Sequence, residues 1–166
     1  MSLRTPRRVL DWLRVTVIAA VLLAAIAALA VTSHPARSAL ATTAKVSTKK
    51  LPKLGVVLVD GRGRTLYMFV PDKRMKVTCV HACAVIWPPM KVAKGQKASA
   101  AGQAKGSLIG SDPNPSGGRV VTYNRWPLYT YITDTVAGTA KGQALNLNGG
   151  LWYVLSPAGK VIRTKP

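Results

Sequence analysis

The chain has 166 residues and a large excess of positive charge, with 24 Lys and Arg against 5 Asp and no Glu. From residue 42 onward it contains 13 Lys, 6 Arg and 4 Asp, a net charge of +15. The length excludes more than one ordinary domain or two very small ones. The charge favours polyanionic partners, with binding that salt screens, although a solvated basic surface explains it equally well.

The first 41 residues predict an export signal. A basic start that includes Arg4, Arg7 and Arg8 precedes an uncharged run over 15–31, and a small-x-small cleavage motif follows at 39–41. This layout is typical of a secretory signal peptide, and an uncleaved signal anchor is the alternative. Either interpretation places the rest of the chain outside the cytoplasm, released or tethered at the cell envelope.

Beyond the signal, composition divides the chain into a linker and one domain. Residues 42–54 are polar and basic, which predicts a flexible linker. Residues 55–166 form the expected domain, made of a first unit over 55–91, a mobile loop over 92–107 and a second unit over 108–166. The loop is assigned because its residues are mostly Lys, Ala, Gly, Gln and Ser.

The domain is expected to be mainly β. Pairs of β-prone runs around turn residues predict three hairpins. They are expected at 56–59 with 65–70, at 119–123 with 127–133 and at 151–155 with 160–163. One short helical turn is predicted near 78–87, capped by Thr78 and ended by Pro88 and Pro89. The predicted fold is two related hairpin-based units packed as one domain.

An internal repeat is the most specific signal in the chain. Residues 66–72 and 128–134 both read L-Y-x-aromatic-x-x-D, with an offset of 62, and a tryptophan follows each copy. A fixed period indicates a duplicated unit that buries its apolar face against its twin. The residues singled out, as structural or binding positions, are Tyr67, Phe69, Asp72, Trp87, Tyr129, Tyr131, Asp134 and Trp152.

The repeated motif has a structural explanation that needs no ligand. Side chains alternate along a strand, so the two aromatic residues of each copy point to one face and supply core. Asp72 and Asp134 come where each strand should end, and their carboxylates are expected to accept backbone N–H bonds and close a turn. The functional alternative is general acid–base work by these two residues in an uncharacterised enzyme.

These motifs resemble a known family, the secreted repeat of unknown function, also described as predicted lipoproteins with a Y-x-(F/W/Y)-x-x-D motif. The resemblance runs from about residue 56 to 161 and includes both motif copies and the C-x-x-x-C-A-x-x-W-P-P segment at 79–89. The chain departs from the family at His81 and Ala144, where the family usually has Gly. The resemblance implies an envelope location and no established activity.

Cys79 and Cys83 are the only cysteines, and outside the cytoplasm they are expected to form a disulfide. The alternative is a redox or metal-linked site that adds His81, but closed zinc sites need four ligands. No nucleophile-and-base arrangement is recognisable. We therefore expect a non-catalytic envelope protein without a cofactor or bound metal. It would bind anionic wall polymers or lipid headgroups, and export argues against a physiological nucleic-acid partner.

Overall fold

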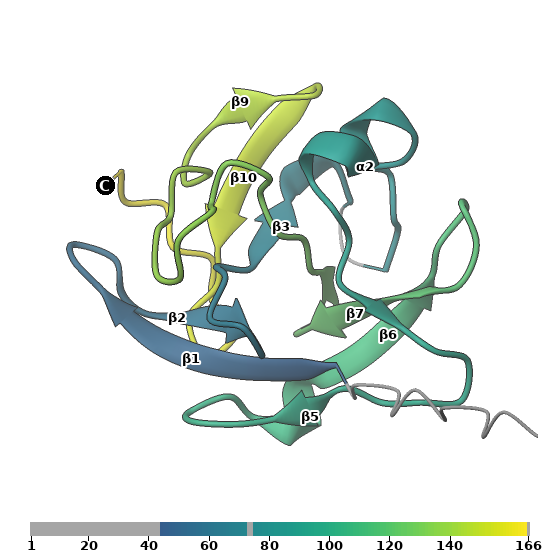
Figure 1. Ribbon diagram of the computed structural model, residues 1–166, viewed down its shortest axis with the longest axis horizontal. Helices are drawn as coiled ribbons and strands as arrows, with labels where there is room; N and C mark the ends of the chain where they lie inside the picture. The colour runs from purple at the N-terminus through teal and green to yellow at the C-terminus, as the bar shows by residue number, and fades with distance from the viewer. Residues whose placement is uncertain (1–43, 73–74, 166) are drawn as a thin grey trace, which may run out of the picture. The chain divides into compact units, whose positions relative to one another are not determined.

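The structure is a computed structural model that describes residues 44–72 and 75–165. The predicted signal peptide or signal anchor, residues 1–41, lies outside these ranges. In the described part the chain is mostly strands and loops, and its one α-helix is the single turn α2 (Ala82–Ile86) (Figure 1). The mainly β prediction is therefore confirmed.

The first sheet joins β1 (Lys45–Leu51) to β2 (Gly55–Asp60) in an antiparallel hairpin, and β5 (Ser99–Ala100) pairs in parallel with β1. The prediction that residues 42–54 are a linker is wrong from residue 45 onward. Strand β1 buries only Val46 and Leu51, near its two ends, and the residues between them are polar. Composition therefore resembles a linker, but backbone pairing along all of β2 makes the segment a strand.

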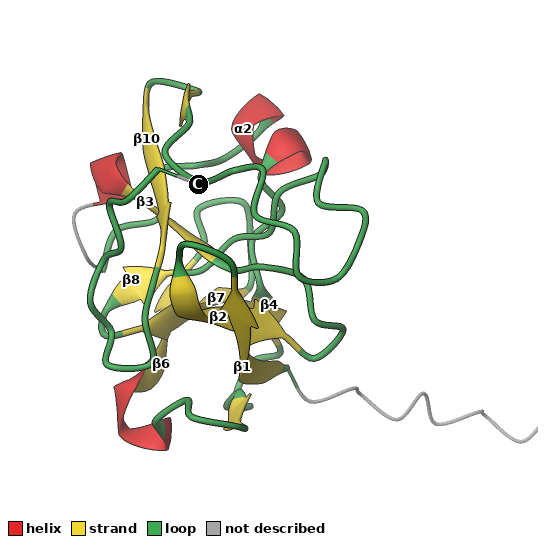
Figure 2. Cartoon of the chain, turned by 90° about the vertical axis from the view of Figure 1, so that its left-hand side faces the viewer, coloured by secondary structure: helices red, strands yellow, loops and turns green. Residues whose placement is uncertain are grey.

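The second sheet contains β4 (Lys91–Val92), β6 (Ile109–Pro113), β7 (Arg119–Tyr123) and β8 (Trp126–Pro127). Strands β6 and β7 form an antiparallel hairpin equivalent to β1–β2. In both Figure 1 and Figure 2, β1, β2, β6 and β7 lie at one end of the domain and α2 at the other.

The third sheet contains β3 (Tyr67–Phe69), β10 (Gly150–Val154) and β9 (Asn146–Leu147), with β10 in the middle. Two single turns of 3₁₀ helix, η1 (Val70–Asp72) and η2 (Gly106–Leu108), complete the described elements. Because β5 lies inside 92–107 and η2 begins there, the segment predicted as a loop carries secondary structure of its own.

Each of the three predicted hairpins forms next to its turn. Strands β7 and β8 pair around Asn124 and Arg125, which have positive φ angles of 46° and 68° as a tight two-residue turn requires. The C-terminal hairpin forms where Leu155 pairs with Val161. The hairpins predicted at 56–70 and 119–133 extend no further than the residues next to their turns, because β3 pairs with β10 and residues 130–132 bond to residues 86–88.

The predicted helical turn exists, but its predicted cap does not. His81 occupies the N-cap position of α2 and makes no capping side-chain hydrogen bond. Thr78 instead donates its hydroxyl to Asp72, at 2.6 Å. The carboxylate is buried, and a buried charge recruits nearby donors more strongly than a helix end does.

The two repeats exchange their motif strands. Trp152 of the second unit pairs with Phe69 of the first on β10 and β3. In the same way Thr130 N–H donates to the Pro88 carbonyl and Ile132 N–H to the Ile86 carbonyl, which sets Tyr131 opposite Trp87. At the centre, Tyr67 and Tyr129 exchange both backbone hydrogen bonds, at 2.8 and 2.9 Å. The units therefore interlock, and neither completes its sheet without the other.

Candidate functional site

A reciprocal pair of hydrogen bonds joins the two motif copies. The Tyr67 hydroxyl donates to Oδ2 of Asp134 at 2.5 Å, and the Tyr129 hydroxyl donates to Oδ2 of Asp72 at 2.7 Å. Each tyrosine therefore uses the aspartate of the other copy. All four side chains are at most 2% exposed. The sequence did not predict either pairing. The signal that reflects these pairings is the fixed spacing of Tyr and Asp in both copies of the motif.

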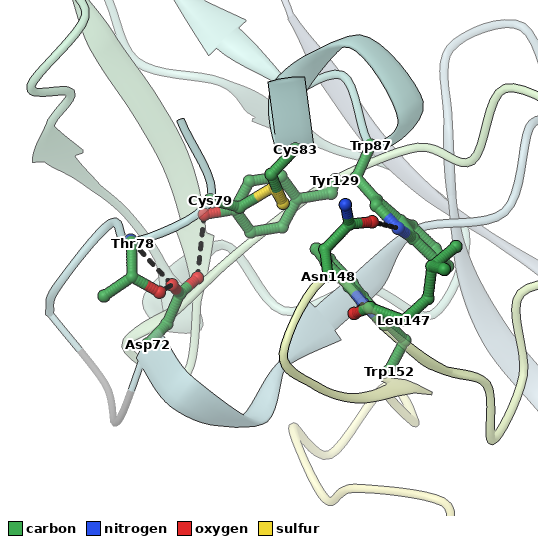
Figure 3. The surroundings of a disulfide bond; sticks show 9 residues. All are labelled: Asp72, Thr78, Cys79, Cys83, Trp87, Tyr129, Leu147, Asn148 and Trp152. Atoms are coloured by element: carbon green, nitrogen blue, oxygen red, sulfur yellow. Dashed lines mark hydrogen bonds between the residues drawn. A yellow bond between two sulfur atoms is a disulfide. The ribbon is translucent and has the colours of Figure 1, made fainter. Parts of the chain in front are cut away.

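Each carboxylate also accepts a backbone N–H from the loop that follows it, as expected of a residue that closes a turn. Asp72 accepts from Thr78 N–H at 2.8 Å (Figure 3), and Asp134 accepts from Lys141 N–H at 3.0 Å. These donors lie six and seven residues downstream, so the loops are wider than a standard β-turn. The second hydroxyl donor is Thr78 for Asp72 and Thr139 for Asp134.

Burial changes the acid–base behaviour of this network. Burial raises the pKa of Asp72 above its ordinary value of 3.8, although the hydrogen bonds from Thr78 and Tyr129 oppose the shift. The pKa values of the Tyr67 and Tyr129 hydroxyls are also raised, first by burial and then by the adjacent carboxylates. Both phenols therefore remain protonated donors at every physiological pH.

The remaining motif residues form one stack of four aromatic rings. Trp87 and Trp152 lie parallel at its centre, with ring centroids 3.8 Å apart. Phe69 stacks on the outer face of Trp152 at 4.1 Å, and Tyr131 stacks on that of Trp87 at 4.2 Å. Each unit thus places its second motif aromatic on the tryptophan of the other unit. The stack supplies much of the core that the sequence predicted from these residues.

Cys79 and Cys83 form the expected disulfide, with their Cα atoms 5.2 Å apart. Figure 3 shows it next to Tyr129 and the turn that leads to Trp87. Cys79 is buried in the aromatic core, whereas His81 is exposed. Among the described residues, no group of three His, Cys, Asp or Glu is arranged to hold a metal ion.

His81 and Ala144, the two positions where the sequence departs from the family that it resembles, both have an unusual backbone conformation. His81 has a φ of 51° and Ala144 a φ of 59°, both in the left-handed region. Glycine enters this region without steric cost, whereas a side chain pays for it. Both positions therefore have a conformation that glycine would adopt at lower cost.

Because seven of the eight motif side chains are buried and Tyr131 is partly buried, they are not available to an outside ligand. A charged cleft of about 450 Å³ beside β1 and β4 is open to solvent, and we call it the basic cleft. Its side chains combine four cations with an apolar wall and one carboxylate. They belong to Ala44, Lys45, Asp60, Arg62, Arg64, Pro88, Pro89, Met90, Lys91 and Thr130, with Gly61 between them.

The turn at the base of the cleft is held by its one carboxylate. Asp60 accepts the backbone N–H groups of Arg62 and Arg64, both at 2.9 Å, and forms an ion pair with the Arg64 guanidinium at 2.8 Å. These bonds occupy the carboxylate and neutralise Arg64. Lys45, Arg62 and Lys91 are exposed and form no ion pair with a carboxylate of the described residues, so the cleft is cationic overall.

The corresponding place in the second unit is filled by the chain itself. There Tyr123 takes the position of Asp60, and its hydroxyl donates to the Pro157 carbonyl at 2.6 Å. Asn124 donates its side-chain N–H to the Gly159 carbonyl at 3.0 Å. The turn over 156–159 therefore closes the second copy of the cleft, whereas in the first unit the chain leaves after β4 and the cleft stays open.

The fold is thus that of a duplicated, mainly β protein whose repeat motif builds its core. Comparison with known families agrees, since the family described as secreted repeat of unknown function matches residues 49–91 and 113–156. The chain belongs to this family of secreted repeats, and the protein is accordingly extracytoplasmic.

The first matched segment begins inside β1, consistent with a repeat unit that starts before residue 55. No curated protein and no solved structure gives a significant match to the chain. Among the described residues, no helix has the length and hydropathy to cross a membrane.

Proposed function

We propose that this protein is a non-catalytic extracytoplasmic module that binds anionic surface polymers or lipid headgroups in the basic cleft. The observation that supports this most is the asymmetry between the twin units. One cleft is filled by the protein's own chain, and the other is open and presents Lys45, Arg62 and Lys91. Oriented cations around a hollow attract polyanions and concentrate them locally.

The buried motif supports a non-catalytic role. The acid–base pair that the sequence offered as a candidate, Asp72 and Asp134, is at most 2% exposed, and hydrogen bonds occupy both carboxylates. A general acid or base must lie within hydrogen-bond reach of the substrate proton that it transfers. These residues instead stabilise the interface between the units.

The test is binding of the exported protein to isolated envelope material at low and high salt. We expect binding at low salt that is lost at high salt, because charge contacts between exposed groups are screened. The double variant Arg62→Gln/Lys91→Gln should weaken binding about tenfold or more, as expected when two charged contacts of about 0.7 kcal/mol each are lost.

The matched control is Lys50→Gln/Lys53→Gln, which removes the same charge from exposed residues around the β1–β2 turn, at the other end of β1 from Lys45. This variant should bind nearly as well as the wild type. Equal losses in both double variants would show that net charge alone drives binding. No binding at low salt would rule out the proposed function.

A further inference from the structure

The basic cleft borders the open edge of a strand. Strand β4 ends the order of its sheet, with β7 as its neighbour. Val121 N–H donates to the Met90 carbonyl at 2.8 Å, and Lys91 lies opposite Val120. In an antiparallel ladder this register makes Lys91 and Val120 a non-hydrogen-bonded pair. The backbone N–H and C=O of Lys91 therefore point away from β7.

The Pro89 carbonyl points to the same edge. Thr130 N–H donates to the Pro88 carbonyl and Met90 N–H to the Leu128 carbonyl, so these two bonds bracket Pro89, which lies opposite Tyr129. Pro89 is again in a non-hydrogen-bonded pair, and its carbonyl is directed outward. Pro89 and Lys91 both line the basic cleft, which gives the cleft two outward backbone carbonyls and one outward N–H.

The second unit shows what this edge holds. Pro89 and Lys91 correspond to Val154 and Ser156, with the same offset of 65 that relates Trp87 to Trp152. There the Val154 carbonyl accepts from Ile162 N–H at 3.0 Å, and Ser156 N–H donates to the Lys160 carbonyl at 2.9 Å. An extended segment of the chain itself is therefore paired to the twin edge.

We infer that the ligand of the basic cleft is an acidic polypeptide in extended conformation, which adds a strand to the edge formed by Pro89 and Lys91. This inference rests on the proposed function and names its ligand class. The peptide would take the place that residues 160–162 take in the second unit. Addition of a strand to an exposed sheet edge is a common mode of peptide recognition, in which backbone bonds give affinity and side-chain contacts give specificity.

The charges around the edge specify the side chains of that peptide. In a bound strand every second side chain points to the same side. A peptide with Glu or Asp at alternate positions therefore directs a row of carboxylates at the cations that line the cleft, Lys45, Arg62 and Lys91. A phosphate polymer meets the same cations, but it has no N–H to offer the Pro89 carbonyl.

The first experiment measures binding of the exported protein to four probes by calorimetry. They are a short peptide of alternating Glu and Thr, two N-methylated forms of this peptide, and poly(glycerol phosphate). One form, or phase, is methylated at the backbone nitrogen of every Glu and the other at that of every Thr. We expect the unmodified peptide to bind most tightly and one N-methylated phase to bind at least about fivefold more weakly, as expected for one lost hydrogen bond of about 1 kcal/mol.

Failure of the inference is distinguishable from failure of the proposed function. If poly(glycerol phosphate) binds and the peptide does not, or if neither methylated phase binds more weakly, the cleft binds anions without strand addition and the inference is overturned. If none of the probes or envelope material binds, the proposed function falls with it.

A pair of substitutions at one position separates backbone from charge. Lys91→Gln removes only the ammonium, whereas Lys91→Pro also removes the N–H that points away from β7. Proline is tolerated on an edge strand where the N–H faces outward, and thermal unfolding checks that the fold is kept. Peptide binding should be about fivefold weaker for Lys91→Pro than for Lys91→Gln, and poly(glycerol phosphate) binding should be equal. Equal peptide affinities would contradict strand addition.

Discussion

At the scale of single residues, the repeat motif is a device for burying polar groups in pairs. A buried carboxylate without partners is costly, and a tyrosine hydroxyl in a core needs an acceptor. Tyr129 and Asp72 meet both needs at once, as do Tyr67 and Asp134. Because each pair joins the two copies, loss of either partner leaves an unsatisfied group in the middle of the domain.

Substitution of Asp72 by Asn should destabilise the protein by about 1–3 kcal/mol at neutral pH. The new amide N–H group would face the donors Thr78 and Tyr129 instead of accepting from them. The change is read from the free energy of unfolding in denaturant. Unchanged stability would show that the carboxylate is dispensable for folding.

The same variant tests the pKa of Asp72. Burial raises this pKa above 3.8 in the folded protein. At a pH above the folded pKa the carboxylate is ionised in both states, and its burial then lowers the free energy of unfolding by the full amount. As the pH falls from the folded pKa toward 3.8, the folded state takes up the proton first and is stabilised. The stability difference between wild type and Asp72→Asn should therefore grow over this window. A difference that is constant or shrinks between neutral pH and pH 4 would contradict the raised pKa.

At the scale of elements, α2 depends on its surroundings. A helix of five residues is far too short to be stable alone. The disulfide closes the chain from Cys79 to Cys83, and Trp87 directly after the helix is fully buried. The second unit reaches its tryptophan without a disulfide, through a β9–β10 hairpin whose turn is Asn148 and Gly149, with φ angles of 56° and 86°.

Removal of the disulfide by Cys79→Ala/Cys83→Ala should cost about 2 kcal/mol, the chain-entropy value for so short a loop. The melting temperature of the wild type should fall on reduction, and that of the variant should not respond to reductant. Peptide and polymer binding by the folded variant should be unchanged, because neither cysteine lines the basic cleft. A wild-type melting temperature that ignores reduction would contradict a structural role for the bond.

At the scale of the whole molecule, the domain is one folding unit made of two sequence units. Strand β3 completes the sheet of β10, and the segment around Tyr131 completes that around Trp87. The four-ring stack alternates between the units in the same way. Interlocked repeats bury a continuous core only when both are present.

Separation of the chain within residues 93–98 should therefore yield two halves that are unfolded alone. Mixing them in equal amounts should restore the far-ultraviolet circular dichroism and the cooperative unfolding of the intact protein, because the reciprocal strand pairs can form between chains. The measurement compares each half, the mixture and the intact protein at equal concentration. Cooperative unfolding of either half alone would show that a single repeat can complete its own core.

Much of the architecture was predictable from local patterns. The β-class, the duplicated motif, the hairpin around Asn124 and Arg125, the short helical turn and the disulfide all follow from alternation, turn residues and cysteine spacing. The strand character of Lys45–Leu51 was not predictable, since only its two buried residues contact the core and its pairing with β2 is what orders it.

The sequence by itself determined that this protein carries two equivalent units with buried-type motifs, because spacing and residue type repeat along the chain. Only the tertiary structure decided that Tyr67 pairs with Asp134 and not with Asp72, and that one cleft is open while its twin is filled. The physical reason is that partners of long-range pairs are chosen by the packing of whole units, and local patterns along the chain do not record which strand completes which sheet.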